Sequence, residues 1–148
     1  MGGGQASCLL APLVGRQAGL LLADTTRYAE KQLFVAQCGV DSARIAAIGG
    51  IEARGVDLWA ERERVLDLLT EAGKNLLAVG RVQVLLLGCL SFLGLAHPLS
   101  ERLGVPVVDP AVAPVALAEC LVRQGLKTSR KAYPAPPLRK RTWQSGQL

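Results

Sequence analysis

The sequence predicts an α/β domain, a parallel β-sheet with helices on both of its faces. Half of the 148 residues are hydrophobic but only 4% are aromatic, so the core must be built from Leu, Val, Ala and Ile, which suits buried parallel strands. Short apolar runs alternate with amphipathic stretches in the order α-β-α-β-α-β-α-β-α, the order expected for a parallel sheet. Such sheets bind ligands outside the carboxyl ends of their strands.

The first half of the chain is expected to contain two helices and two strands. In chain order these are a helix over 5–14, a strand over 18–23, a helix ending near 38 and a strand over 44–48. Thr25 or Thr26 is predicted to cap the second helix, and Gly39 to end it. Gly49 and Gly50 are predicted to break the second strand.

The second half is expected to contain three helices and two strands. In chain order these are a helix from 57 to 73 or beyond, a strand over 82–87, a helix over 92–103, a strand over 105–108 and a helix over 109–124. The buried stripe of the first of these helices is predicted to comprise Leu58, Val65, Leu68 and Leu69, with residues 61–64 mostly on its wet side. Pro98 must lie in the first turns of its helix.

The basic charge is concentrated at one end of the chain. The net charge is +5, and residues 127–141 hold basic residues and no acidic one. We therefore divide the chain into an α/β domain over 1–126 and a basic, Pro-rich tail over 127–148. Only Tyr133 and Trp143 accompany these charges, whereas nucleic-acid binding by stacking needs interleaved aromatic residues, so no nucleic-acid partner is expected.

The four cysteines do not follow the spacing of a zinc site. They occur without a CxxC pair, and His97 is the only histidine, so no metal is expected. Cys8, Cys38 and Cys120 are predicted to be core residues, and His97 a surface residue. The sequence has no secretory signal and no apolar run long enough to span a bilayer, so we expect free thiols in the cytoplasm and no membrane partner.

The remaining cysteine follows the strongest strand signal in the chain. Gly88-Cys89-Leu90-Ser91 comes directly after the apolar run that ends at Leu87. Gly88 would let the backbone turn sharply beside a ligand. A following helix N-terminus would favour the thiolate of Cys89, and the N–H groups of Leu90 and Ser91 could hold a carboxylate or carbonyl oxygen. The same pattern also fits a small buried hydrophobic residue.

Three stretches resemble the C-terminal part of the hydantoin and allantoin racemases, in the aspartate/glutamate/hydantoin racemase superfamily. Leu86-Leu87-Gly88-Cys89 with Gly94-Leu95-Ala96 resembles the second catalytic cysteine turn of that family. The other two stretches are Leu99 to Asp109, and Gly125 to Ser129 with Tyr133 and Pro136-Pro137. Gly15-Arg16 and the Thr25-Thr26 turn resemble further family elements.

The resemblance implies one lobe of a two-lobed α/β fold with the active site between the lobes. It implies an isomerase that racemises a carbon next to a carbonyl in a hydantoin-, allantoin- or amino-acid-like small molecule, using two cysteines and no cofactor. Cys89 matches the second cysteine, and Thr25 and Thr26 fall at a turn that helps bind substrate in relatives. With Gly88, Leu90 and Ser91 of the cysteine turn, they are the predicted substrate-binding residues. A homo-oligomer is left open.

The chain departs from the family in ways that leave its activity open. The first catalytic cysteine of relatives lies in an N-terminal lobe that precedes the matched region, and Cys8 aligns after it. Ser91-Phe92 replaces a Gly-Met pair, and Pro110 replaces a Gly. The alternative to an active racemase is therefore a non-catalytic binding or interaction module that keeps the racemase scaffold.

Overall fold

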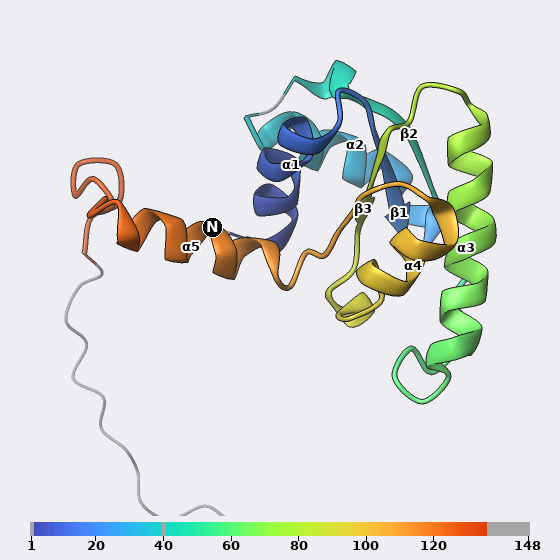
Figure 1. Cartoon of the computed structure of the whole chain (residues 1–148). Helices are drawn as coiled ribbons and strands as arrows, with labels where there is room; N and C mark the ends of the chain where they lie inside the picture. The colour runs from blue at the N-terminus through green and yellow to red at the C-terminus, as the bar shows by residue number, and fades with distance from the viewer. Residues whose placement is uncertain (1, 40, 136–148) are drawn as a thin grey trace, which may run out of the picture.

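A four-stranded parallel sheet lies at the centre of the molecule (Figure 1). The computed structural model describes residues 2–39 and 41–135. The strands are β1 (Ala18–Leu22), β2 (Ile45–Gly50), β3 (Val84–Leu87) and β4 (Val107–Val108), in the sheet order β2-β1-β3-β4. All three neighbouring pairs are parallel, so the predicted α/β class is confirmed.

Helices cover both faces of this sheet. The helices α1 (Gly3–Val14) and α2 (Tyr28–Gln37) pack on one face, and α3 (Arg62–Ala78) and α4 (Ala96–Leu103) on the other. The last helix, α5 (Ala113–Arg123), extends away from the sheet (Figure 1). The α-helices and strands alternate in the predicted order. Three short 3-10 turns lie between them, which are η1 (Thr25–Arg27), η2 (Ser42–Arg44) and η3 (Leu90–Phe92).

The two central strands are buried on both faces. Every residue of β1 and β3 is buried, and successive side chains enter opposite layers, as the pleat requires. Leu21, Leu85 and Leu87 face α3 and α4. Leu20, Leu22 and Leu86 face α1 and α2. Each of these apolar strands therefore contributes side chains to two separate hydrophobic layers, one on each face of the sheet.

The prediction that Gly49 and Gly50 break the second strand is wrong. Both glycines belong to β2, where they pair with Leu21 and Leu22 of β1. A Cβ atom on Gly50 would overlap the carbonyl oxygen of Leu22. The close approach of the backbones of β1 and β2 thus explains why position 50 is a glycine, and β2 extends to this residue.

The third helix begins later than the sequence indicated. It starts at Arg62 rather than near Asp57, because the Asp57 carboxylate accepts hydrogen bonds from Trp59 N and Ala60 N, both at 2.9 Å, and closes a separate turn. Val65 and Leu69 are buried as predicted. Leu58 packs against the same core but lies before the helix, and Leu68 is 36% exposed, so the predicted burial is wrong only for Leu68.

The last two helices also begin later than predicted. The helix α4 starts at Ala96, with Pro98 in its first turn as expected, and α5 starts at Ala113 rather than at Pro110. The carboxylate of Asp109 accepts hydrogen bonds from Gly94 N at 2.9 Å and Ala111 N at 2.8 Å. These bonds hold the chain in a turn where a helix was predicted.

The described part of the predicted tail carries no helix or strand. Residues 127–135 are exposed, while Trp143 and the rest of the tail lie outside the described residues. The boundary between 126 and 127 stays a prediction. Among the described residues, none of the helices combines the length and apolarity needed to cross a bilayer.

The close approach at Gly50 makes a stability prediction. We expect Gly50→Ala to lower the free energy of unfolding by about 1–3 kcal/mol, because the added methyl group overlaps a backbone atom that cannot rotate away. Gly49→Ala is the matched control, since its Cβ would meet only the tip of the Leu76 side chain, at 3.1 Å. Urea denaturation measures both, and equal losses for the two variants would contradict this account.

Candidate active site

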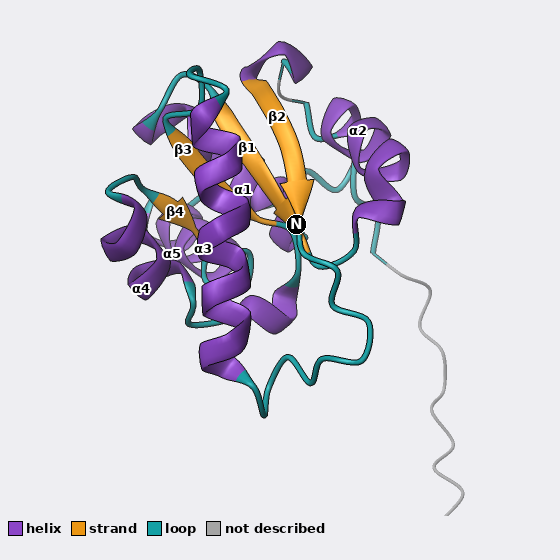
Figure 2. Ribbon diagram, turned by 90° about the vertical axis from the view of Figure 1, so that its right-hand side faces the viewer, coloured by secondary structure: helices purple, strands orange, loops and turns teal. Residues whose placement is uncertain are grey.

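Two polar turns meet at one edge of the sheet. The turn at Asp24–Thr26 follows β1, and the turn at Gly88–Ser91 follows β3. These strands are adjacent and parallel (Figure 2), so both turns lie at the same edge. The sheet order reverses direction between β1 and β3, and open α/β sheets bind ligands at such a switch point.

Asp24 organises the turn after β1. Its carboxylate accepts hydrogen bonds from Thr26 N at 2.9 Å and Thr26 Oγ1 at 2.5 Å. The hydrogen bond from the Thr26 side chain, followed by that from its backbone, lowers the pKa of Asp24. Asp24 therefore caps η1, while α2 begins at Tyr28 with Arg27 at its N-cap position and no side-chain cap, so the prediction that Thr25 or Thr26 caps this helix is wrong.

The two threonine hydroxyls both donate to carboxylates. Thr26 bonds Asp24, and Thr25 Oγ1 donates to the carboxylate of Glu52, which follows β2. A hydroxyl has a single hydrogen to donate but two lone pairs. Because both hydroxyl hydrogens are used in these bonds, the Thr25 and Thr26 oxygens can only accept hydrogen bonds from a ligand, for example from its N–H groups.

Gly88 is required by the packing of β3 against β1. Its N–H donates to Leu21 O at 2.7 Å. A Cβ atom at this position would lie 2.7 Å from Leu22 Cδ2 and 2.8 Å from Leu21 O. The glycine was predicted to allow a sharp turn beside a ligand, but the close neighbour in the structure is the backbone of β1.

Cys89 lies half-buried at the start of η3. Its carbonyl accepts from Phe92 N at 3.2 Å, and Leu90 O accepts from Leu93 N at 3.1 Å. Within residues 2–39 and 41–135, the N–H groups of Leu90 and Ser91 have no hydrogen-bond acceptor, as is usual at the start of a helical turn. The Cys89 side chain packs partly against the apolar layer beneath α3 and α4.

The helix predicted directly after Cys89 is wrong. A 3-10 turn of three residues follows, and α4 begins only at Ala96. The aligned peptide dipoles of an α-helix therefore do not point at the thiol.

Arg62 fixes the cysteine turn from the opposite helix. Its Nη1 donates to Ser91 O at 2.8 Å and to Leu58 O at 3.4 Å, and its Nη2 donates to Leu93 O. The guanidinium lies 5.1 Å from the ring centroid of Trp59. The sequence interpretation placed Arg62 on the wet side of its helix, since no local pattern indicates a contact across 29 residues.

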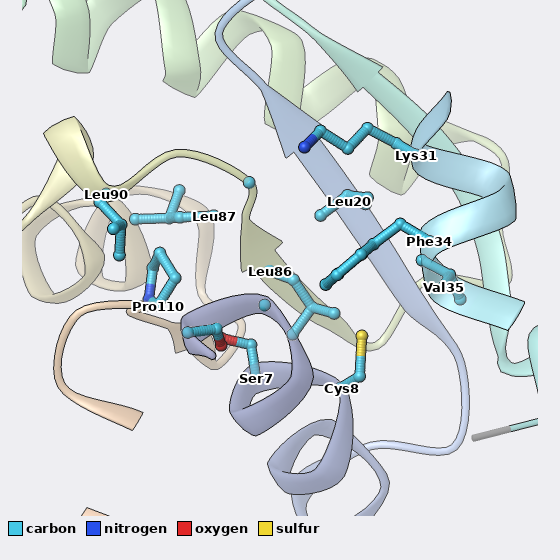
Figure 3. Close-up of a pocket in the computed structure, with 13 residues that line it drawn as sticks. Ser7, Cys8, Leu20, Lys31, Phe34, Val35, Leu86, Leu87, Leu90 and Pro110 are labelled. Atoms are coloured by element: carbon cyan, nitrogen blue, oxygen red, sulfur yellow. The ribbon is translucent and has the colours of Figure 1, made fainter. Parts of the chain in front are cut away.

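A small apolar cavity opens beside the same edge (Figure 3). It has a volume of about 150 Å³ and lies between α1, α2 and the carboxyl ends of β1 and β3. Gly88 and Leu90 line it together with Ser7 and Lys31, whereas Cys89 is not among its lining residues. The residues predicted for the site therefore fall into two groups. Cys89 packs toward α3, whereas Gly88 and Leu90 line the cavity on the α1 side of the sheet.

The other cysteines behave differently from Cys89. Cys8 and Cys38 are buried as predicted, and burial, with Cys38 nearby, raises the pKa of Cys8 to about 12. Cys8 is therefore a neutral thiol at physiological pH. Cys120 is exposed on α5, so its prediction as a core residue is wrong, because α5 leaves the sheet.

The remaining candidate ligands do not cluster. The His97 side chain is 84% exposed, as expected for a surface residue, and lies 3.5 Å from Glu101. Within residues 2–39 and 41–135, no group of three or more His, Cys, Asp or Glu side chains could hold a metal ion.

The family model for Asp/Glu/Hydantoin racemase matches residues 1–118. The chain belongs to this family. Over 84 residues it is 38% identical to a hydantoin racemase of Paenarthrobacter aurescens, a match that covers 55% of this chain and 36% of that protein. Over 82 residues it is 37% identical to a hydantoin racemase of Pseudomonas sp. (strain NS671), covering 55% and 33% of the two chains.

Solved structures of allantoin racemases share the fold. That from Pseudomonas fluorescens aligns with a TM-score of 0.71 and 27% identity, covering 95% of this chain and 60% of the other. That from Klebsiella pneumoniae aligns with a TM-score of 0.83 and 22% identity, covering 97% and 58%. The chain thus spans about three fifths of the length of these two relatives.

The contacts of Arg62 predict that it stabilises the cysteine turn. We expect Arg62→Met to lower the free energy of unfolding by about 1–3 kcal/mol, since charged hydrogen bonds to carbonyl groups are lost. Hydrogen exchange of the amides over 88–94 should accelerate as well. Arg64→Met, which removes an exposed ion pair to Glu61, should do neither, and unchanged exchange in Arg62→Met would refute the role.

The raised pKa of Cys8 predicts a loss of stability at alkaline pH. The folded state favours the neutral thiol, so the contribution of Cys8 is fully present below the pKa of an ordinary thiol, 9.0, and is lost as pH rises toward about 12. We expect the stability advantage of the wild type over Cys8→Ala to shrink between pH 9 and 11 in urea titrations. The cost of Leu86→Ala, a buried neighbour in the same layer, should stay constant, and a constant Cys8→Ala difference would contradict the assignment.

Proposed function

We propose that this chain supplies the Cys89 half of a cofactor-independent racemase active site. The substrate class is a hydantoin-, allantoin- or amino-acid-like molecule with an acidic C–H next to a carbonyl. Cys89 is the proposed acid/base group, and Thr25, Thr26, Gly88, Leu90 and Ser91 form the proposed substrate-binding turns. Membership of the racemase family and the names of the matched relatives support this class of reaction.

One arrangement carries the proposal. The cysteine turn lies beside the Asp24–Thr26 turn at the point where the sheet order reverses. The N–H groups of Leu90 and Ser91, which bond no acceptor in the described part of the chain, adjoin the half-buried thiol, and Arg62 donates to the carbonyl of Ser91 in this turn. A sulfur, two donors and two acceptor hydroxyls thus occur together where ligands of such sheets bind.

These groups suit a proton transfer at carbon. A thiolate at Cys89 would take the proton from one face of the substrate carbon, and the negative charge would move onto the carbonyl oxygen. Aimed N–H groups stabilise such an oxyanion. A second group, present as an acid, would return a proton to the opposite face, so that the configuration inverts. The substrate is then neutral again, Cys89 is a thiol, and the negative charge lies on the second group. The Thr25 and Thr26 hydroxyls would accept ring or ureido N–H groups.

One observation favours a second candidate function. The Cys89 side chain packs toward the apolar layer and does not line the nearby cavity. A non-catalytic module that retains the racemase scaffold would bind a small ligand in that cavity without using the thiol. Loss of Cys89 would then leave the role of the protein intact.

Deuterium exchange separates the two functions. With an enantiopure 5-substituted hydantoin, and separately with allantoin, in D₂O, we expect wild-type protein to accelerate deuterium uptake at the chiral carbon above the buffer rate. Cys89→Ser should reduce this acceleration at least about 100-fold, the usual weight of a general base. The matched control Cys120→Ser removes an exposed thiol on α5 and should exchange as the wild type does.

The form of exchange reports how many groups act. Deuterium uptake with retained enantiomeric excess indicates a single working group, whereas uptake with equal loss of enantiomeric excess indicates a pair. Uptake that Cys89→Ser leaves unchanged, or no uptake above buffer with either compound, would refute the proposal and favour the binding module.

A further inference from the structure

The cavity beside α1 and α2 has one positively charged side chain in its wall. The polar side chains that line it are those of Ser7, Cys8 and Lys31, and its other lining residues are apolar or glycine. Lys31 reaches toward the cavity from α2, whereas Leu87 and Leu90 lie on its other side (Figure 3). A mostly apolar wall with a few polar groups is the usual composition of a small-molecule site.

The Lys31 ammonium has no acidic partner within residues 2–39 and 41–135. The adjacent Glu30 accepts two hydrogen bonds from Arg27, both at 2.8 Å, and the ion pairs among these residues do not include Lys31. The ammonium lies instead 5.7 Å from the ring centroid of Phe34. This contact favours a position at the cavity wall without neutralising the charge. An anion in the cavity would supply a partner.

The other two polar side chains leave the anion to Lys31. Ser7 Oγ donates its hydrogen to Gly3 O at 3.0 Å, so only its lone pairs remain for a ligand. Burial raises the pKa of Cys8 to about 12, so its thiol is neutral at physiological pH and does not repel an anion. The negative end of a ligand is therefore expected at Lys31.

The size of the cavity limits the rest of the ligand. Its volume is about 150 Å³, and an apolar cavity of similar volume binds benzene in another protein. The apolar side chains around it come from two helices and the two central strands, and they include Leu20, Phe34, Val35 and Leu86. The body of the ligand is therefore expected to be one ring or a short branched chain.

A carboxylate suits this cavity better than a more highly charged group. One ammonium can balance one negative charge, and each further charge would be moved from water into an apolar space without a partner. A planar carboxylate on a small ring places its charge at one end and its apolar area at the other. The distribution of polar and apolar side chains in the cavity wall has the same two-ended form.

We propose that the cavity between α1, α2 and the ends of β1 and β3 binds a small carboxylate with an apolar body, whose charge pairs with Lys31. This inference does not rest on the proposed racemase reaction, because Cys89 is not among the lining residues. The carboxylate belongs either to a free monocarboxylate or to the side chain of a hydantoin, and the experiments below separate these two sources.

A comparison of benzoate with benzamide tests the charge. The two molecules have nearly the same shape, but benzamide is neutral. In ¹⁵N-labelled wild-type protein we expect benzoate to bind at least about 10-fold more tightly, the usual weight of a charged hydrogen bond. The largest amide shift changes should fall on residues 3–8 and 31–35. No binding of benzoate, equal affinities for the two molecules, or shift changes confined to other residues would overturn the proposal.

A substitution at Lys31 tests the residue. Lys31→Met keeps a flexible apolar chain and removes the charge, so benzoate should bind at least about 10-fold more weakly while benzamide binds as before. The matched control Lys74→Met removes a lysine that pairs with Glu71 on α3 at 2.7 Å and should bind benzoate as the wild type does. Circular dichroism checks folding, and the wild-type comparison decides if Lys31→Met does not fold. Unchanged benzoate affinity in folded Lys31→Met, or an equal loss in Lys74→Met, would overturn the role of Lys31.

Competition identifies the source of the carboxylate. A hydantoin with a carboxymethyl group at its 5-position should displace benzoate if the carboxylate is part of a hydantoin. It should bind independently of benzoate if the ligand is a free monocarboxylate. Both results support the carboxylate site, because each requires benzoate to occupy it.

The variant Cys89→Ser keeps this inference apart from the proposed function. It should bind benzoate as the wild type does, and a loss of binding would overturn the placement of the ligand in the cavity. Lys31-dependent benzoate binding without Cys89-dependent deuterium uptake would support the cavity site and refute the proposed racemase. Cys89-dependent uptake without Lys31-dependent benzoate binding would overturn this inference alone.

Discussion

The close pairing of β1 with β3 is the constraint on which the rest of the structure depends. Both strands are buried on both faces, and Gly88 N donates to Leu21 O at 2.7 Å just beyond the last paired residues. No side chain larger than hydrogen fits there. This contact sets the distance between the two polar turns, because each turn begins within a few residues of it.

The position of the thiol follows from that pairing and from one arginine. Cys89 leaves the sheet directly after the contact, and Arg62 holds the carbonyl groups of the next turn from the first turn of α3. Burial raises the pKa of Cys8 to about 12, so its thiol is neutral at physiological pH. Cys89 is only half-buried and lies in a turn at the end of β3. Local packing thus gives two cysteines of one chain different surroundings.

The sequence predicted the sheet better than it predicted the helix boundaries. The leucine-rich runs of β1 and β3 identify buried strands because their signal is local and strong. The half-buried strands β2 and β4, which contain no leucine, were also predicted. The start of α5 was misplaced because Asp109 bonds Gly94, fifteen residues away, and the start of α3 because Asp57 forms its own turn. Gly50 was misinterpreted as a strand breaker because its meaning lies in the neighbouring strand.

The candidate site was also predicted only in part, because some of its features depend on local sequence and others on contacts between distant segments. The positions of Thr25, Thr26 and Cys89 after their strands followed from the order of elements along the chain. Arg62 and the cavity beside Gly88 did not, since both arise from contacts between segments far apart in sequence. The exposure of Cys120 could not be predicted either, because nothing local to α5 indicates that it leaves the sheet.

The central claim is that ligand binds at the two polar turns after β1 and β3. A titration with ligand, followed by amide chemical shifts, tests it most directly. In ¹⁵N-labelled protein titrated with a 5-substituted hydantoin, the account predicts that the largest shift changes fall on residues 24–26 and 88–91, at the point where the sheet order reverses. Shift changes that are absent from both turns, or larger elsewhere in the protein, would contradict it.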